Sequence, residues 1–319
     1  MNRYLLVILA LVIFILFATG SSGNESQTKH FDNGEISFDY PGAWNGTNGT
    51  APNVVTFTDT NGMNVTVLKL SKPSTYNLAK SLSLNAAGTI NQNFQLVSSK
   101  NVTVNGIMAY ELEYNVNGKN GPQQRKEVWF EKNNVIYCVI YTAPGQGKVD
   151  SGVEIDESFG GKSLESMITS FNIKDGVANP TKSTGWAEIS IPDINANWKI
   201  SSYSINTPGA VYHIPTSYFP GEKGEMSLMG HRTTHHAPFL YIYTLKPGNL
   251  VIIKDNLTQK KYTYQVESNG DVRWGAKGIN IKYQPSDEPK LLLVTCHPPG
   301  FSRAAWIVHC KLVSVEPLS

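Results

Sequence analysis

The segment LLLVTC at residues 291–296 ends in a cysteine, and HPPG follows at once. Proline lacks the N–H group that a β-ladder requires, so a strand here must stop and leave Cys296 at the rim of its sheet. A thiol at a rim can meet a substrate. Taken alone, Cys296 is better explained as a small apolar residue at a strand end, because only a thiol with a lowered pKa is reactive.

A reactive cysteine needs a base or a cation nearby, because a free thiol has a pKa near ~8.5 and is mostly protonated at neutral pH. The histidines are the candidates for the base. His231 differs from the others because it follows the strand-like segment MSLMG, whose glycine ends the strand and places the imidazole at a rim as well. Arg303 is the candidate for the cation, seven residues after the thiol and at the start of the segment RAAWIVHC.

The other histidines do not make a metal site. A zinc cluster that adds His235 and His236 to the two rim residues has no acidic residue or second cysteine at a suitable spacing, so solvated loop side chains are predicted. His297 follows the thiol directly and is expected to point away from Cys296, since neighbours along a strand alternate between its faces. No metal and no cofactor are predicted.

The two remaining cysteines are expected in the core. Cys138 lies inside the apolar run VIYCVIYT, and free cysteine is among the most buried residue types. Cys310 falls on the opposite face of its strand from Arg303, Ala305 and Ile307, so it is not predicted to partner the rim thiol.

Two folded regions must position these residues. Residues 30–174 read as short strands separated by Asn-Gly turns, which supply the positive φ of tight hairpins. Helical patches at 77–92 and 157–171 interrupt the strands; in the second, apolar residues recur at the i, i+3, i+4 and i+7 positions of one helix face. This pattern predicts an antiparallel sheet sandwich with helices, of the α+β class.

The segment DGVANPTKSTG, residues 175–185, has the composition of a linker. Residues 186–319 again read as many short strands, with a single helical turn at 239–245. Such a pattern predicts an all-β sandwich or barrel.

The order of segments in residues 30–174 resembles the PsbP-like domains. ISFDYPGAW, a long meander, VNGIMAYELEY, VWFEKNNVIYCVIYT and MITSFNI carry the resemblance, which covers nearly this whole region. It implies a binding or assembly module without catalytic activity, and no cluster of residues in the sequence of this region argues otherwise.

In the second region SLMGHR, PFLYIYTLKPGN, LLLVTC and an arginine seven residues later occur in this order. Their order and approximate spacing resemble the sortases, the cysteine transpeptidases of prokaryotic surfaces. Leu292 stands where the family has Thr and Asn249 where it usually has Asp, which leaves the substrate pocket or subclass in question rather than the activity. The resemblance implies a closed β-barrel of about eight strands.

The resemblance also implies roles for three catalytic residues. Cys296 would attack the carbonyl of a Thr-Gly bond in a sorting signal and form a thioester. His231 would protonate the departing amine and later deprotonate the incoming one. Arg303 would hold the substrate carbonyl or the oxyanion as it forms.

The implied function is that of a cell-surface transpeptidase. Its partners would be secreted proteins that carry a sorting signal and an amine acceptor of the cell wall or of another surface protein. A cysteine endopeptidase that lets water resolve the thioester, and an inactive surface binding protein, remain the alternatives, because the sequence does not encode the nucleophile.

The N-terminal segment 1–23 is a signal or an anchor. Residues 4–18 form an uninterrupted apolar run that, as a helix, would span about 22 Å of a hydrocarbon core of roughly 30 Å, so its length leaves both possibilities open. An anchor in the cell membrane with both domains extracellular is favoured because a sortase would act there. Secretion after cleavage is the alternative.

Export also agrees with the Asn-x-Ser/Thr triplets, although chance in an Asn-rich chain explains them equally well. They begin at Asn24, Asn45, Asn48, Asn64, Asn101 and Asn256. The net charge of the chain is only +2, and its Lys and Arg residues are scattered, so nucleic acid is not a predicted partner.

Overall fold

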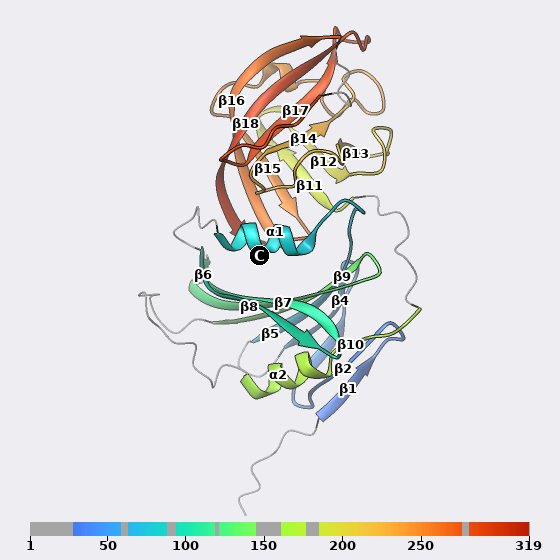
Figure 1. The fold of residues 1–319 in the computed structure, drawn as a ribbon, viewed down its shortest axis with the longest axis vertical. Coiled ribbons are helices and arrows are strands. Elements are labelled where there is room, and N and C mark those ends of the chain that lie inside the picture. The colour runs from blue at the N-terminus through green and yellow to red at the C-terminus, as the bar shows by residue number, and fades with distance from the viewer. Residues whose placement is uncertain are drawn as a thin grey trace, which may run out of the picture.

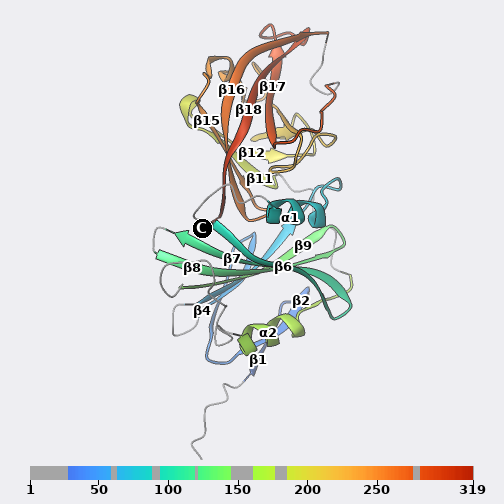
Figure 2. The same ribbon diagram turned by 60° about the vertical axis from the view of Figure 1, so that its left-hand side comes forward.

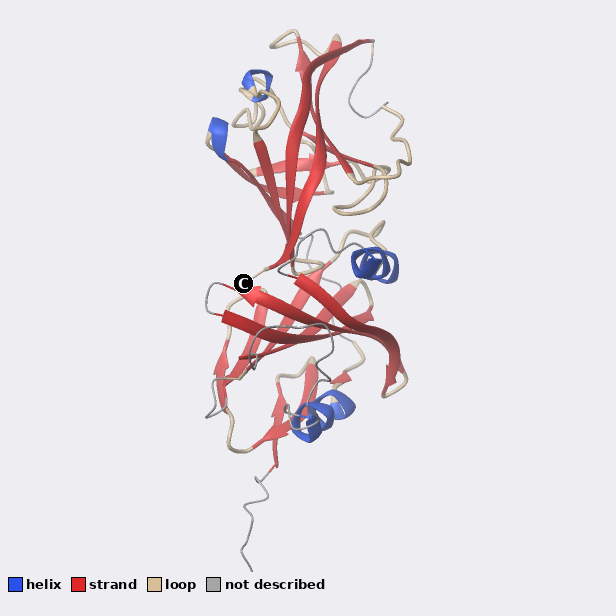
Figure 3. Ribbon diagram, turned by 90° about the vertical axis from the view of Figure 1, so that its left-hand side faces the viewer, coloured by secondary structure: helices blue, strands red, loops and turns tan. Residues whose placement is uncertain are grey.

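The structure is a computed structural model that describes residues 28–58, 63–87, 94–118, 121–144, 161–176, 185–275 and 281–318. The predicted anchor at residues 4–18 lies outside these ranges. Within them, no helix has both the length and the apolar character needed to cross a membrane. Strands make up most of the secondary structure along the described chain (Figure 3).

The N-terminal half is built around a seven-stranded antiparallel sheet with the strand order β3-β4-β5-β9-β8-β7-β6 (Figure 1). A three-stranded sheet of order β1-β2-β10 lies beside it. The strands are β1 Thr28–Asp32, β2 Ile36–Pro41, β3 Asn45–Asn48, β4 Asn53–Thr58, β5 Asn64–Ser71, β6 Phe94–Val104, β7 Ile107–Gly118, β8 Gly121–Lys132, β9 Val135–Pro144 and β10 Asn172–Ile173.

Two helices accompany these sheets, α1 Leu78–Ala87 and α2 Gly161–Ser170. Each lies inside a predicted helical patch, and the adjoining residues 88–93 and 145–160 are outside the described ranges. The predicted apolar face of α2 is confirmed: the buried side chains are Leu164, Met167, Ile168 and, just after the helix, Phe171. The ring of Phe171 stacks on Phe38 at 5.6 Å and on Phe130 at 4.6 Å, which fixes α2 against both sheets.

Strand β9 shows why the run VIYCVIYT has no polar alternation. Tyr137 and Val139 pack into the cluster that α2 covers, whereas Ile136 and Cys138 pack into the cluster shared with α1 and the C-terminal half. A strand with both faces covered is apolar throughout. Cys138 is fully buried as predicted, and burial raises the pKa of its thiol well above the ordinary value.

The C-terminal half is a closed barrel with the strand order β11-β12-β13-β14-β17-β18-β16-β15. The predicted fold class is therefore confirmed for both halves. The elements are β11 Ala187–Ile191, η1 Pro192–Ile194, β12 Ala196–Ser201, β13 Ala210–His213, β14 Glu225–Met229, η2 Ile242–Thr244, β15 Leu250–Asp255, β16 Lys260–Trp274, β17 Lys290–His297 and β18 Ala304–Pro317. The domain boundaries themselves stay a prediction, and residues 177–184 of the expected linker lie outside the described residues.

Strand β16 illustrates how alternation builds the barrel. Tyr262, Tyr264 and Val266 are 0%, 0% and 2% exposed and fill the interior, whereas Lys261 and Thr263 between them are half-buried. Burial of one such large apolar side chain contributes about 2 kcal/mol to the free energy of folding. The alternation along this strand therefore determines which of its faces lies inside the barrel.

Helix α1 lies between the seven-stranded sheet and the barrel (Figures 1 and 2). A polar cluster joins the same two parts. Nζ of Lys260 in the barrel donates to the hydroxyl of Tyr114 at 3.2 Å, and Nη1 of Arg125 donates to the carbonyl of Leu318 at 2.7 Å. The two halves of the molecule are therefore connected by buried polar contacts as well as by an apolar core.

Candidate active site

The strand register brings Cys296 and His231 together. Strands β14 and β17 run parallel, with Met229 opposite Val294, so the residues two positions further along each strand leave the same rim side by side. The Gly230 amide donates to the Val294 carbonyl at 3.0 Å, and the Thr295 hydroxyl donates to the Gly230 carbonyl at 2.8 Å. These two hydrogen bonds hold the backbone before His231 against the backbone before Cys296.

Gly230 has a steric role in this arrangement. A Cβ atom at this position would lie 2.6 Å from Cγ of Phe239, a ring that is fully buried. The amide of Phe239 also donates to the His231 carbonyl at 3.1 Å. The glycine therefore lets the chain turn out of β14 directly over Phe239, and the turn sets the position of His231.

Cys296 is half-buried on the outer face of the barrel. Leu292 and Val294, which share this face of β17, pack in a small apolar cluster with Ile307 of β18, while Cys310 packs in the interior as predicted. Burial raises the pKa of the Cys296 thiol, although the positive charge of Arg232 opposes the shift. The resting thiol is therefore neutral at pH 7 and needs a base to become a nucleophile.

His231 is held by partners on both ring nitrogens. Nε2 lies 2.9 Å from Oδ1 of Asn206, and Nδ1 lies 3.2 Å from the hydroxyl of Thr234. The ring of His235 stacks on it with centroids 4.4 Å apart. Burial, with a smaller contribution from the charge of His235, lowers the pKa of His231, so its resting form at pH 7 is the neutral imidazole that can accept a proton.

Arg303 lies at the predicted rim but does not contact the thiol. In the β17–β18 pairing Cys296 is opposite Ala305, so Arg303 precedes β18 at the end of the strand beside the cysteine. Its side chain is exposed, with the guanidinium carbon 5.1 Å from the centre of the Phe301 ring. Among the described residues it forms no ion pair.

A second arginine, Arg232, contacts the cysteine segment, and no motif in the sequence distinguishes it. Nη1 of Arg232 donates to the Cys296 carbonyl at 3.3 Å and lies 3.3 Å from Nδ1 of His297. His297 packs on Trp306 and lies on the face opposite the thiol, as predicted. Arg232 follows His231 in the sequence, but only the turn after β14 reveals which way its side chain points.

The neighbouring histidines of the loop are exposed. His235 and His236 both have positive φ, at 50° and 66°, in a tight turn after Thr234. Over the ranges that the structure describes, no group of three or more His, Cys, Asp or Glu side chains is arranged to hold a metal ion.

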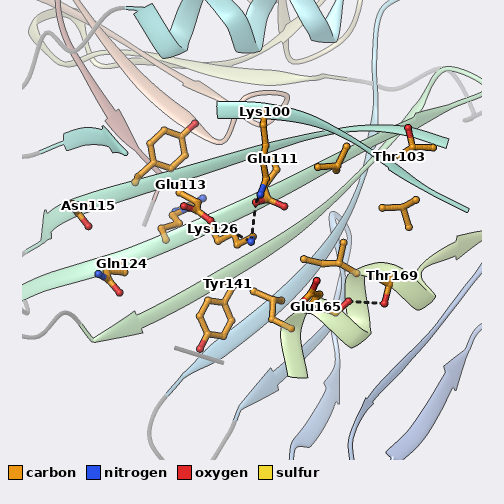
Figure 4. Close-up of a pocket in the computed structure, with 16 residues that line it drawn as sticks. Lys100, Thr103, Glu111, Glu113, Asn115, Gln124, Lys126, Tyr141, Glu165 and Thr169 are labelled. Atoms are coloured by element: carbon orange, nitrogen blue, oxygen red, sulfur yellow. Dashed lines mark hydrogen bonds and ion pairs between the residues drawn. The ribbon is translucent and has the colours of Figure 1, made fainter. Parts of the chain in front are cut away.

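A separate cavity of about 450 Å³ lies in the N-terminal half, between the sheet and α2 (Figure 4). The Glu111 carboxylate, 5% exposed, lies 2.9 Å from Nζ of Lys100 and 2.9 Å from Nζ of Lys126. Burial opposes ionisation, but the two ion pairs outweigh it and lower the pKa of Glu111. This cluster was not predicted from the sequence, because its residues come from three strands and only the register of β6, β7 and β8 brings them together.

The closed barrel has a thiol and an imidazole at its rim, the two groups that nucleophilic acyl transfer uses. Residues 189–313 match the family model of the sortase domain, and residues 18–173 match that of PsbP-like protein. The resemblances seen in the sequence are therefore confirmed for both regions, and sortases as a family are cysteine transpeptidases.

Similar proteins include Sortase SrtE1 of Streptomyces coelicolor, which is 29% identical over 171 residues. That match covers 46% of this chain and 48% of the relative, so the chain spans about half the length of this curated relative. A crystal structure of Sortase E1 from Streptomyces coelicolor with a tripeptide in the active site is 26% identical, covering 42% of this chain and 90% of that one with a TM-score of 0.36. Clostridium perfringens Sortase D5 is 26% identical, with 41% and 79% covered and a TM-score of 0.35.

Proposed function

We propose that the chain is a cell-surface sortase that cleaves a sorting signal in a secreted protein and transfers it to an amine acceptor. One observation carries the proposal: Cys296 and His231 leave the same rim on adjacent parallel strands, joined by the hydrogen bonds of Gly230 and Thr295. A thiol and a neutral imidazole at the ends of neighbouring strands on one rim are the pair of groups that nucleophilic acyl transfer needs.

In the first half of the proposed reaction His231 takes the proton of the Cys296 thiol as Sγ attacks the scissile carbonyl. The tetrahedral intermediate then loses its C–N bond, His231 returns the proton to the departing amine, and a thioester to Cys296 remains. In the second half the acceptor amine attacks the thioester carbonyl and loses a proton to His231. The C–S bond breaks, and the sulfur takes that proton back.

Arg303 is proposed to bind the substrate carbonyl or the oxyanion. Its side chain is exposed and close to the cysteine strand, and it forms no ion pair with any residue that the structure describes. A guanidinium is always charged and presents its N–H donors in a rigid fork, so it can follow the carbonyl oxygen as negative charge develops there.

The substrate is proposed to be a segment of a secreted protein that carries a sorting signal. It would reach the half-buried Cys296 at the barrel rim. Val294 and Ile307 on the same outer face are themselves buried, so they support the rim beneath the thiol and do not contact the peptide.

The location is proposed to be the cell membrane, with residues 4–18 as the anchor and both halves of the chain outside the cell. The proposal rests on the apolar run in the sequence and on the surface role of the sortase reaction. The first residue of the mature protein, determined by mass spectrometry, tests it: a chain that begins near Ser21 would show that the segment is cleaved.

Peptide cleavage tests the reaction. The full-length protein in detergent is incubated with peptides that vary the residues before a Thr-Gly bond, with and without hydroxylamine. We expect a hydroxamate at the new C-terminus and, without an amine, a thioester adduct on the intact protein. Cys296→Ala should abolish both products, and Cys310→Ala, which changes a buried thiol of the same barrel, should keep them.

Two outcomes would contradict the proposal. A free carboxylate as the sole product, even with excess amine, would indicate an endopeptidase. A folded protein that forms no adduct with any peptide in the panel would indicate a binding protein.

A further inference from the structure

A buried guanidinium lies directly behind the candidate nucleophile. Arg232 is only 7% exposed. Its Nη1 donates to the Cys296 carbonyl at 3.3 Å and also lies 3.3 Å from Nδ1 of His297. The guanidinium carbon lies 5.0 Å from the centre of the Tyr243 ring and 5.5 Å from that of Trp306. Two aromatic rings and two polar contacts therefore hold the group in one place.

This buried cation has no carboxylate partner within the described ranges of the chain. A buried charge without a counter-ion is costly, and most buried arginines avoid that cost with an ion pair. Burial accordingly lowers the pKa of Arg232, and the two groups whose negative charge would raise it are the Tyr243 hydroxyl and the Cys296 thiol. Of these two, only the thiol must ionise in the proposed reaction.

We propose that Arg232 is a positioning residue for the nucleophile: it fixes the Cys296–His297 peptide at the barrel rim, and its charge stabilises the thiolate that forms at Sγ of Cys296. This role rests on the proposed function in one respect: the thiolate of Cys296 is taken to be the nucleophile. The role differs from that of Arg303, which is exposed and free to follow the substrate. Arg232 instead acts on the enzyme before any substrate is bound.

The location of Arg232 in the chain supports this role. It directly follows His231, so one turn after β14 places the acid–base candidate and the cation at the same rim. Cys296 lies one residue before the end of β17, where the strand ladder gives way to Pro298 and Pro299. Cys296 is still paired with Ala305 of β18, whereas the pairing with β14 ends at Val294, so the hydrogen bond from Arg232 to the Cys296 carbonyl adds a restraint on the side where β14 has ended.

The stacking supports it as well. Because Tyr243 and Trp306 hold the guanidinium over their ring faces, the charge is in place before the thiolate forms and does not have to reorganise during the reaction. Removal of the charge should therefore change the ionisation of Cys296 itself, which a purely structural contact would not do.

The test is the pH dependence of Cys296 alkylation by iodoacetamide in the full-length protein, with peptide mapping to identify the labelled thiol. R232Q keeps a hydrogen-bond donor near the Cys296 carbonyl but removes the charge, and R232K keeps the charge. We expect R232Q to raise the thiol pKa and to slow alkylation at pH 7 about threefold to tenfold, as the loss of one nearby charge at a half-buried site implies. The alkylation rate of R232K at pH 7 should stay within about twofold of that of the natural protein, because lysine keeps the positive charge and the charge affects the thiol more than the hydrogen bond does.

The matched control is K261Q, which removes a cation of the same barrel whose charge is neutralised by Glu316 at 2.8 Å and which lies at the opposite end of β16 and β18 from Ala305, the residue opposite Cys296. It should leave the alkylation profile unchanged. An alkylation rate and pH profile for R232Q equal to those of the natural protein, in a sample with native near-UV circular dichroism, would overturn the proposal. Equal slowing of R232Q and R232K would overturn the charge effect. If R232Q does not fold, R232M, which also removes the charge but keeps a long side chain between the rings, takes its place in the same comparison.

Alkylation requires no peptide substrate, so this result is independent of the proposed transpeptidation. A chain that shows the expected R232Q shift but forms no thioester with any peptide would retain the inference about Arg232 and lose the proposed function.

Discussion

Nε2 of His231 lies 2.9 Å from Oδ1 of Asn206, a residue of the connection between β12 and β13 that is 25 positions away in the chain. With this oxygen as the acceptor, Nε2 carries the proton and Nδ1 is the basic nitrogen of the neutral ring. Asn206 thus sets the tautomer in which His231 approaches the thiol, much as the strand register sets its position.

Substitution of Asn206 should affect the acid–base step. Asn206→Ala removes one hydrogen bond worth about 1 kcal/mol, so we expect kcat/KM for peptide cleavage to fall about fivefold. Asn206→Asp places a carboxylate beside the ring, which favours the imidazolium and raises the His231 pKa. The acidic limb of the pH–rate profile should then move to higher pH. The exposed Asn197 on β12 provides a control, and Asn197→Ala should leave both measurements unchanged; equal losses in the two alanine variants would contradict the role of Asn206.

The natural protein should show a bell-shaped dependence of kcat/KM on pH. Burial lowers the pKa of His231 and raises that of Cys296, so the two pKa values move apart from their ordinary values of about 6.5 and about 8.5. As the pH rises, kcat/KM should first increase as His231 loses its proton, with a midpoint below about 6.5. It should then decrease as the thiol ionises, with a midpoint above about 8.5. A profile with a single limb, measured on a peptide that gives a hydroxamate, would show that one of the two groups is not essential.

The sequence could predict the rim positions because each depends on local chemistry. Pro298 and Pro299 stop β17 after Cys296, and Gly230 ends β14 before His231. The alternation along β18 correctly assigned Cys310 to the interior. These inferences require only the period of a strand and the residues that interrupt it.

The contacts of those residues could not be predicted, because they depend on distant segments. Asn206 reaches His231 through the barrel closure, and the side chain of Arg232 is directed by a turn whose course the sequence does not specify. Lys260 and Glu127 were likewise not recognised as buried, since strand alternation assigns faces but does not show that a second domain covers one of them. The continuous apolar run of β9 was the one local indication of that cover.

Glu127 should contribute strongly to the stability of the contact between the N-terminal half and the barrel. Its carboxylate is fully buried, lies 2.8 Å from Nε of Arg125 and accepts a hydrogen bond from the Trp129 indole at 3.1 Å. Arg125 in turn binds the Leu318 carbonyl. Glu127→Gln leaves this buried cation uncompensated, so the free energy of unfolding measured in urea should fall by about 3–5 kcal/mol.

Glu35 in the same half of the chain provides the control for this prediction. Its side chain is 38% exposed and pairs with Lys69, which is 29% exposed, at 2.6 Å. Because water screens that pair, Glu35→Gln should cost less than about 1 kcal/mol. Equal destabilisation by the two glutamine variants would show that the Glu127 cluster contributes no more than a surface pair.

Gly230 should be required both for the packing of the turn after β14 and for the position of His231 in that turn. Gly230→Ala forces a Cβ to within 2.6 Å of the Phe239 ring, so the ring or the turn must shift. We expect a loss of about 1–3 kcal/mol in the free energy of unfolding, the usual cost of overpacking a core. The turn also carries His231, so peptide cleavage by the folded variant should fall by more than tenfold, because small displacements of a catalytic group are costly.

The double variant G230A/F239A separates steric from other causes. Alanine removes Cγ and Cδ2 of Phe239, the two atoms that the new Cβ would meet most closely, so F239A should destabilise the natural chain but cost less in the G230A background. The coupling energy from the four proteins, measured by urea unfolding, should therefore favour the double variant by about 1 kcal/mol or more. Additive effects would show that the close approach to Phe239 is not the reason for a glycine before His231, and restored cleavage in the double variant would show that it is.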